Sequence, residues 1–167
     1  MPHKAFPRRF IYRDTLDPDT AQRLAALTLA GCDDGELYLQ YQASESFGFD
    51  DGRLKTADYS SHAGFGLRGV TGETTAFAHA NEISEAAIRR AGETMTLLDP
   101  AKDAKAPPPR RTNSALYTAD DPLGLVPFAR KVALCQEIDA AARARDPRVV
   151  QVSATIAVVG AIALALG

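Results

Sequence analysis

The sequence predicts an α+β fold: an antiparallel or mixed sheet meander with two or three flanking helices. The sheet signal lies in residues 36–80, where apolar and polar residues alternate from Leu37 to Ala43, the period of a half-buried strand. Asp51-Gly52 is a strong signal for a tight hairpin turn, and Thr71-Gly72-Glu73 marks a second turn. We therefore expect a meander of four or five short strands in this stretch.

A helix is expected on each side of the meander. The first opens at Asp17-Pro18-Asp19, where Asp17 is a suitable cap and proline suits the first helical position. Leu24 and Leu27 are expected to face inward, and Gly31 to end the helix. Because one helix covers the sheet from each end of the meander, the pattern indicates layered α+β packing.

The second helix is expected from Glu82 to about Leu97, with Asn81 as its cap. Apolar residues recur every fourth position along it, which predicts one buried face. These inward positions are Ile83, Ala87, Ala91 and Met95.

A third helix is expected from about Pro127 to Arg145, ended by Asp146-Pro147 because the residue before proline avoids helical angles. Its apolar side would hold Phe128, Val132, Cys135, Ile138 and Ala142. A returning strand is expected from Arg148 to Val159. One face of that strand would carry Val150, Val152, Ala154, Ile156 and Val158, and the other Gln151, Ser153 and Thr155.

The end of the sequence is uncharged from Val149 to Leu166 and reads GAIALALG. A membrane anchor is one interpretation, but the alternation of Gln151, Ser153 and Thr155 with valines favours a core or edge strand that is cut short. The chain is accordingly divided into an arm (1–13), an α+β core (14–98), a proline-rich linker (99–116), a helix and strand of the same domain (117–159) and an apolar tail (160–167).

Three glycines in the meander, Gly64, Gly66 and Gly69, fit the spacing of a phosphate-binding loop. That loop needs a helix directly after it, whereas a turn and another strand follow here, so we reject the interpretation. Gly64 and Gly66 share one strand face with Arg68, which predicts that a backbone or a large ring passes close to them.

Composition limits the classes of partner. The 167 residues carry a formal net charge of −2, so nothing indicates nucleic-acid binding, and the basic run 105–111 is explained as a solvated linker. Cys32 and Cys135 are isolated, which indicates idle thiols in a reducing cytosol. The opening MPHKAFPRRF lacks the apolar region of a secretory signal. A cytoplasmic protein without membrane attachment is expected.

The residue types that carry chemistry do not form a recognisable pattern. The histidines His3, His62 and His79 have no partner at metal-ligand spacing, and His62 with His79 across the sheet would supply only two ligands. The serines Ser44, Ser46, Ser60 and Ser61 are assigned to strand ends, and a serine next to His62 points to the opposite face. Turn and helix-exit roles explain Asp33, Asp34, Asp50 and Asp51. No catalytic, cofactor-binding or metal-binding residue is therefore predicted.

Four blocks in order do, however, resemble a known family: DDGELYLQYQASESFGFDDGRLK, GFGLRGVTGETTAFAHANEISEAAIRRA, LYTADDPLG and KVALCQEIDAAARARDPRVVQVSA. They resemble the N-terminal domain of the TldD subunit of the TldD/PmbA (TldD/TldE) metalloproteases, from about Phe10 to Ala157. Members of that family are about three times longer, and their HExxxH-type zinc motif lies in a C-terminal half with no counterpart here. From Val158 onward the sequence departs from the family pattern, which fits a truncated or frameshifted gene product or a fragment limited to the first domain.

The resemblance implies cytosolic zinc peptidases, built from two related subunits, that cleave flexible peptides. We therefore expect a non-catalytic scaffold and assembly domain, with no cofactor of its own, that pairs with a PmbA/TldE-like subunit or with its own missing half. An exposed strand edge at Arg148 to Val159 motivates this expectation. The alternatives are an independent peptidase or hydrolase with an unrecognised site, and a general protein-interaction module.

Overall fold

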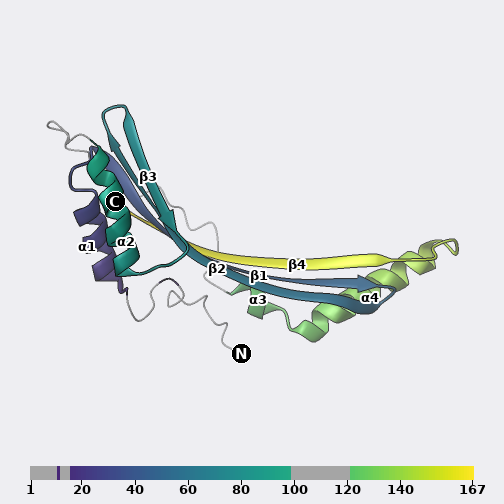
Figure 1. The fold of residues 1–167 in the computed structure, drawn as a ribbon. Helices are drawn as coiled ribbons and strands as arrows, with labels where there is room; N and C mark the ends of the chain where they lie inside the picture. Colours follow the sequence, from purple (N-terminus) through teal and green to yellow (C-terminus); the bar gives the residue numbers. More distant parts are fainter. Residues whose placement is uncertain (1–10, 12–15, 99–120) are drawn as a thin grey trace. The chain divides into compact units, whose positions relative to one another are not determined.

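The computed structural model describes Ile11 and residues 16–98 and 121–167 (Figure 1). The expected linker 99–116, and the expected arm 1–13 apart from Ile11, lie outside the described residues. The elements are α1 (Pro18–Thr28), β1 (Asp34–Asp50), β2 (Arg53–Thr71), β3 (Thr74–Ala80), α2 (Glu85–Gly92), the 3-10 helix η2 (Glu93–Leu97), α3 (Pro122–Leu125), α4 (Phe128–Arg145) and β4 (Ser153–Leu166). The strands form one antiparallel sheet in the order β3-β2-β1-β4, which confirms the α+β class.

The meander contains three strands, two of them long, and the expectation of four or five short strands is wrong. β1 has 17 residues and β2 has 19, because the polar and glycine positions interpreted as breaks continue the strands. The expected hairpin turn is confirmed, since Asp51 (φ 49°) and Gly52 (φ 69°) both have the positive φ of a type I′ turn. Gly72 (φ 57°) turns the chain from β2 into β3, where Thr71 pairs with Thr74.

The described residues divide into two compact units. The helix-α4 unit holds residues 42–61 and 121–161, and the α1–α2 unit holds Ile11 and residues 16–41, 62–98 and 162–167. Because β1, β2 and β4 each contribute to both units, the division does not follow the ends of the elements.

In the α1–α2 unit, α1 and α2 lie side by side (Figure 1). The Asp17 carboxylate accepts a hydrogen bond from the Thr20 amide at 2.8 Å, which confirms the predicted cap of α1. Leu24 is buried as expected, but Leu27 is 60% exposed, so its assignment to the core is wrong. The core of this unit includes Ile11, Leu16, Leu24, Leu37, Leu39, Leu67 and Ile88.

The second helix begins later than expected. Ser84 caps α2, since its hydroxyl accepts a hydrogen bond from the Ala87 amide at 3.2 Å; the assignment of this role to Asn81 is wrong. Ala87 and Met95 are buried as predicted. Ile88, fully buried, was not among the predicted inward positions because it lies about 100° around α2 from Ala87, off the four-residue spacing.

In the helix-α4 unit, α4 packs on β1. The rings of Phe47 and Phe128 have centroids 5.1 Å apart, and Cys135 is 1% exposed. Ile138, expected to face inward, is 43% exposed. Lys131 is buried instead, because its amine bonds the Glu45 carboxylate.

The returning strand is displaced from its predicted position. β4 begins at Ser153 rather than Arg148 and continues through the expected apolar tail to Leu166. Its even-numbered residues from Ala154 are less exposed than the odd ones, as the alternation predicted, whereas Val150 lies outside the strand and is 86% exposed. Among the helices of the described ranges, none combines the length and the hydropathy required to span a bilayer.

Candidate assembly edge of the sheet

His62 and His79 line the same shallow hollow on the sheet, of about 310 Å³, together with Tyr38 and Phe77. The two imidazoles thus share one face of the α1–α2 unit, while His3 lies outside the described residues. Within the described ranges, no three histidine, cysteine, aspartate or glutamate side chains gather as metal ligands would.

Gly64 and Gly66 line this hollow, and both confirm the prediction that a backbone or a ring passes close to them. A Cβ on Gly66 would lie 3.4 Å from the Phe77 ring, and one on Gly64 would lie 2.8 Å from the carbonyl oxygen of Ala80. The Ala80 backbone fills the space beside Gly64, and the Phe77 ring fills the space beside Gly66. β2 then leads into a turn and β3. The geometry of a phosphate loop at a helix N-terminus is therefore not formed.

The serines and aspartates contribute to the sheet structure. Ser44 and Ser60 are hydrogen-bonded across β1 and β2 with 2.8 Å between their hydroxyl oxygens, and they lie within the strands rather than at strand ends. Asp33 accepts a hydrogen bond from the Gly72 amide at 2.7 Å. Asp50 accepts from Gln151 at 2.9 Å and from Ser153 at 3.1 Å, and these bonds lower the pKa of its carboxyl group. A role in the turn does not fully explain Asp50. Its hydrogen bonds with Gln151 and Ser153 also link the end of β1 to the start of β4.

Both cysteines are free thiols. Burial raises the pKa of Cys135 on α4 and of the half-buried Cys32, so neither has the lowered pKa of a reactive cysteine. Cys32 lies in an apolar hollow of about 520 Å³ beside α1 and η2, together with Leu27, Met95 and Leu98.

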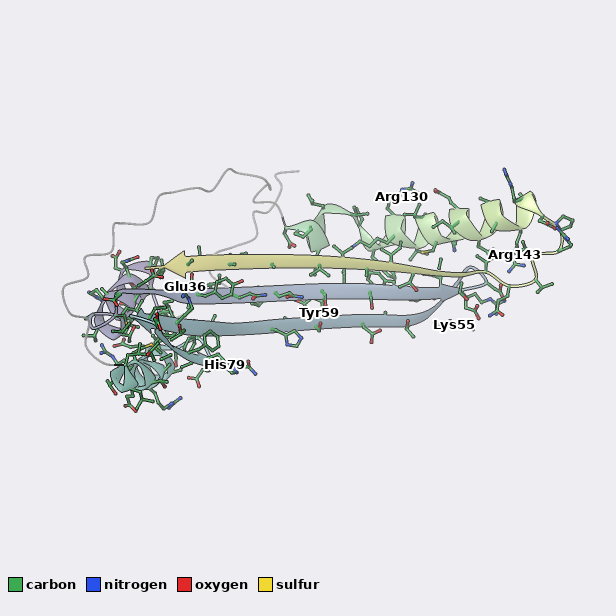
Figure 2. The ribbon with its side chains drawn as sticks, turned by 90° about the horizontal axis from the view of Figure 1, so that it is seen from above. Glu36, Lys55, Tyr59, His79, Arg130 and Arg143 are labelled. Atoms are coloured by element: carbon green, nitrogen blue, oxygen red, sulfur yellow. The ribbon has the colours of Figure 1, made fainter. Side chains whose placement is uncertain are left out.

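One feature available for recognition is the outer edge of β4. β4 is the last strand of the sheet and is paired with β1, and no further strand lies beyond it among the described residues. In Figure 2, β4 and β2 are the two outer strands of the three long ones, with β1 between them. Its 14 residues, SATIAVVGAIALAL, include no charged residue and no proline. Natural edge strands are usually protected by such residues, so no residue of β4 itself would block the addition of another strand.

The direction of the β4 backbone groups follows from one hydrogen bond. The Asp51 amide donates to the Val152 carbonyl oxygen at 2.9 Å, so Val152 directs its carbonyl toward β1. Because these groups alternate along an antiparallel strand, the odd-numbered residues of β4, from Ser153 to Ala165, direct their amide and carbonyl groups outward.

Helix α4 carries exposed apolar residues. Leu134 and Ile138 are 41% and 43% exposed, one helical turn apart. Leu134 and Arg143 are nine positions apart, which is about two and a half helical turns. Arg143 bonds Asp51 at the β1–β2 turn. Leu134 and Arg143 therefore lie on opposite sides of α4.

Comparisons with known proteins relate this fold to a family. Residues 35–98 match the profile of PmbA/TldA metallopeptidase domain 1. The chain is 33% identical over 128 residues to the metalloprotease TldD homolog of Haemophilus influenzae, and 33% identical over 126 residues to that of Buchnera aphidicola subsp. Schizaphis graminum. Each alignment covers 74% of this chain but 27% and 26% of the relative. The chain thus spans about a quarter of the length of the curated relatives it matches.

Two solved structures share the fold. A candidate modulator of DNA gyrase from Bacteroides thetaiotaomicron superposes with a TM-score of 0.60 at 16% identity, over 89% of this chain and 35% of that one. A second candidate modulator, from Thermotoga maritima, gives 0.51 at 14% identity, over 88% and 34%. At these identities the likeness concerns the fold alone.

The fold and the matching profile define the first domain of a metallopeptidase family. The resemblance to the TldD/PmbA family is confirmed: residues 35–98 of this chain are the first domain of the PmbA/TldA metallopeptidases.

Proposed function

We propose that this chain is a non-catalytic scaffold and assembly domain of a TldD-like zinc metallopeptidase. In this proposal, zinc binding and the cleavage of flexible peptides belong to the portion of the family enzymes that this chain does not span. Its partner is a PmbA/TldE-like subunit or the remaining portion of a TldD-like chain, and the cytoplasm is its location. No residue described above is assigned a catalytic or metal-binding role.

One observation carries the proposal: the outer edge of β4, which includes no charged residue and no proline. Strand addition satisfies the outward backbone groups of such an edge.

Copurification tests the proposal. The chain, produced with a PmbA/TldE-like subunit, is expected to elute in a complex with it, and Ala157→Lys, which places a charge on the edge strand, is expected to weaken that complex. Thr75→Lys is the matched control, because it places the same charge on β3, the opposite edge of the sheet. Equal binding by both variants would mean that β4 is not the assembly surface.

Catalysis is tested separately. The purified chain is expected to contain no stoichiometric zinc by elemental analysis and to leave an unstructured peptide intact. A zinc-loaded preparation that hydrolyses the peptide would replace the proposal with the alternative of an independent hydrolase.

A further inference from the structure

The apolar hollow beside α1 and η2 has the dimensions of a ligand site. Its volume of about 520 Å³ falls within the range of roughly 300–1,000 Å³ that is typical of small-molecule pockets. Most of its surface is apolar, and Leu27, Met95 and Leu98 contribute to it. Leu27 is 60% exposed, so a ligand bound there would shield it from water. All the lining residues belong to the α1–α2 unit, so the site lies within one compact unit.

The hydroxyl and charged side chains of the hollow are paired, with one exception. The hydroxyl groups of Thr28 and Thr96 each donate to a backbone carbonyl oxygen of the preceding turn, at 2.7 Å and 2.6 Å. The Arg89 guanidinium donates to the Glu85 carboxylate at 2.7 Å and 2.9 Å. The Glu93 carboxylate lines the hollow and has no hydrogen bond or ion pair with any other residue that the structure describes.

These observations specify the chemistry of a ligand. An apolar body gains from leaving water for the apolar wall, and a cation gains from the unpaired carboxylate. Arg89 does not provide a matching site for an anion, because Glu85 already holds its guanidinium. We infer that the hollow binds a small amphipathic cation, a hydrocarbon or aromatic body that carries one amine, with the body against Leu27 and Met95 and the amine beside Glu93. This site is separate from the β4 edge used in the proposed function, and either can fail without the other.

Three naphthalene probes separate the contribution of charge from that of the apolar body: 1-naphthylmethylamine, 1-naphthalenemethanol and 1-naphthoate. Fluorescence titration of the full chain at neutral pH is expected to show saturable binding of the amine, about three- to fivefold tighter than the alcohol, with the carboxylate weakest. Glu93→Gln is expected to remove the preference for the amine and to leave the affinity for the alcohol unchanged. Equal affinity for the three probes, or a preference for the amine that persists in Glu93→Gln, would overturn the inference.

Gly31 allows the hollow to be filled. A Cβ on Gly31 would have no neighbour within 4 Å, and Gly31 is not among the glycines with positive φ, so a larger side chain has room there without backbone strain. Gly31→Leu is expected to weaken binding of the amine by about tenfold or more, whereas Gly31→Ala should change it little. Thr75→Leu adds the same side chain on β3, outside the hollow, and should bind as the wild type does. Circular dichroism verifies that each variant is folded. Wild-type affinity in a folded Gly31→Leu variant would mean that the probe binds elsewhere, against the inference.

Cys32 reports whether the hollow is occupied. Its thiol lines the hollow, whereas Cys135 is 1% exposed. The amine probe is expected to slow the alkylation of Cys32 by iodoacetamide, followed by mass spectrometry of proteolytic peptides, and to leave the rate at Cys135 unchanged. A saturating amine that does not protect Cys32 would contradict the assignment of the site.

Discussion

Replacing Lys131 by methionine would leave a carboxylate unpaired beneath α4. The Lys131 side chain is 5% exposed, and its amine bonds Glu45 on β1 and the Leu123 carbonyl oxygen, the latter at 3.2 Å. It also lies 5.7 Å from the centre of the Phe47 ring. Methionine fills a similar volume but supplies no hydrogen-bond donor, so the change isolates the charge from the packing.

The size of the effect follows from burial. Removing one partner of a buried ion pair costs about 3–5 kcal/mol, because the other charge stays desolvated. Glu45 keeps 16% of its side-chain exposure, so we expect a value near the lower limit, about 3 kcal/mol. The double variant Lys131→Met with Glu45→Leu removes both charges and is expected to recover most of the loss.

Urea denaturation followed by circular dichroism measures the free energy of unfolding of the wild type, both single variants and the double variant. A favourable coupling energy of roughly 2 kcal/mol or more is expected from the cycle. A cost below about 0.5 kcal/mol for Lys131→Met, with no coupling to Glu45, would match a solvated surface pair and would refute the reasoning.

Three further variants test the packing, capping and electrostatics of the sheet and helices. Gly64→Ala is expected to destabilise the chain by about 1–3 kcal/mol in the same denaturation assay, since its Cβ would meet the Ala80 carbonyl oxygen at 2.8 Å, whereas Gly66→Ala is the milder control at 3.4 Å from a ring. Asp17→Ala is expected to lower the urea midpoint through loss of the α1 cap, and a change within error would show that the cap is redundant. The pKa of Asp50 is lowered in the folded chain, so its stabilisation is present above the usual pKa of 3.8 and is lost as the pH falls through the folded value. The midpoint difference between wild type and Asp50→Asn should therefore be full at neutral pH and disappear in acid; a difference independent of pH would contradict this origin.

The sequence predicted those features that depend on local backbone preference. The turn at Asp51-Gly52 and the cap at Asp17 were correct because each depends on neighbouring residues alone. The lengths of β1 and β2 were not predicted, since polar residues on an open sheet face interrupt the hydrophobic pattern without interrupting the strand.

The helix faces were harder to predict because burial depends on distant segments. Leu27 and Ile138 have the spacing of core residues, yet nothing among the described residues packs over them fully. Lys131 has the character of a surface residue, and only the position of Glu45, 86 residues earlier in the chain, explains its burial. The pattern of β4 left a core strand and an edge strand as alternatives, and its position at the end of the strand order is seen only in the structure.

The pairing of β1 with β4 joins positions far apart in the sequence: Gln151 bonds Asp50 across 101 positions. At about 5–20 residues per second, the ribosome needs roughly 5 to 20 seconds to synthesise the intervening chain. During that interval the nascent β1 has its hairpin partner β2 on one side and nothing on the other. Recombinant yield should therefore respond to translation speed and to chaperones that shield an unpaired strand.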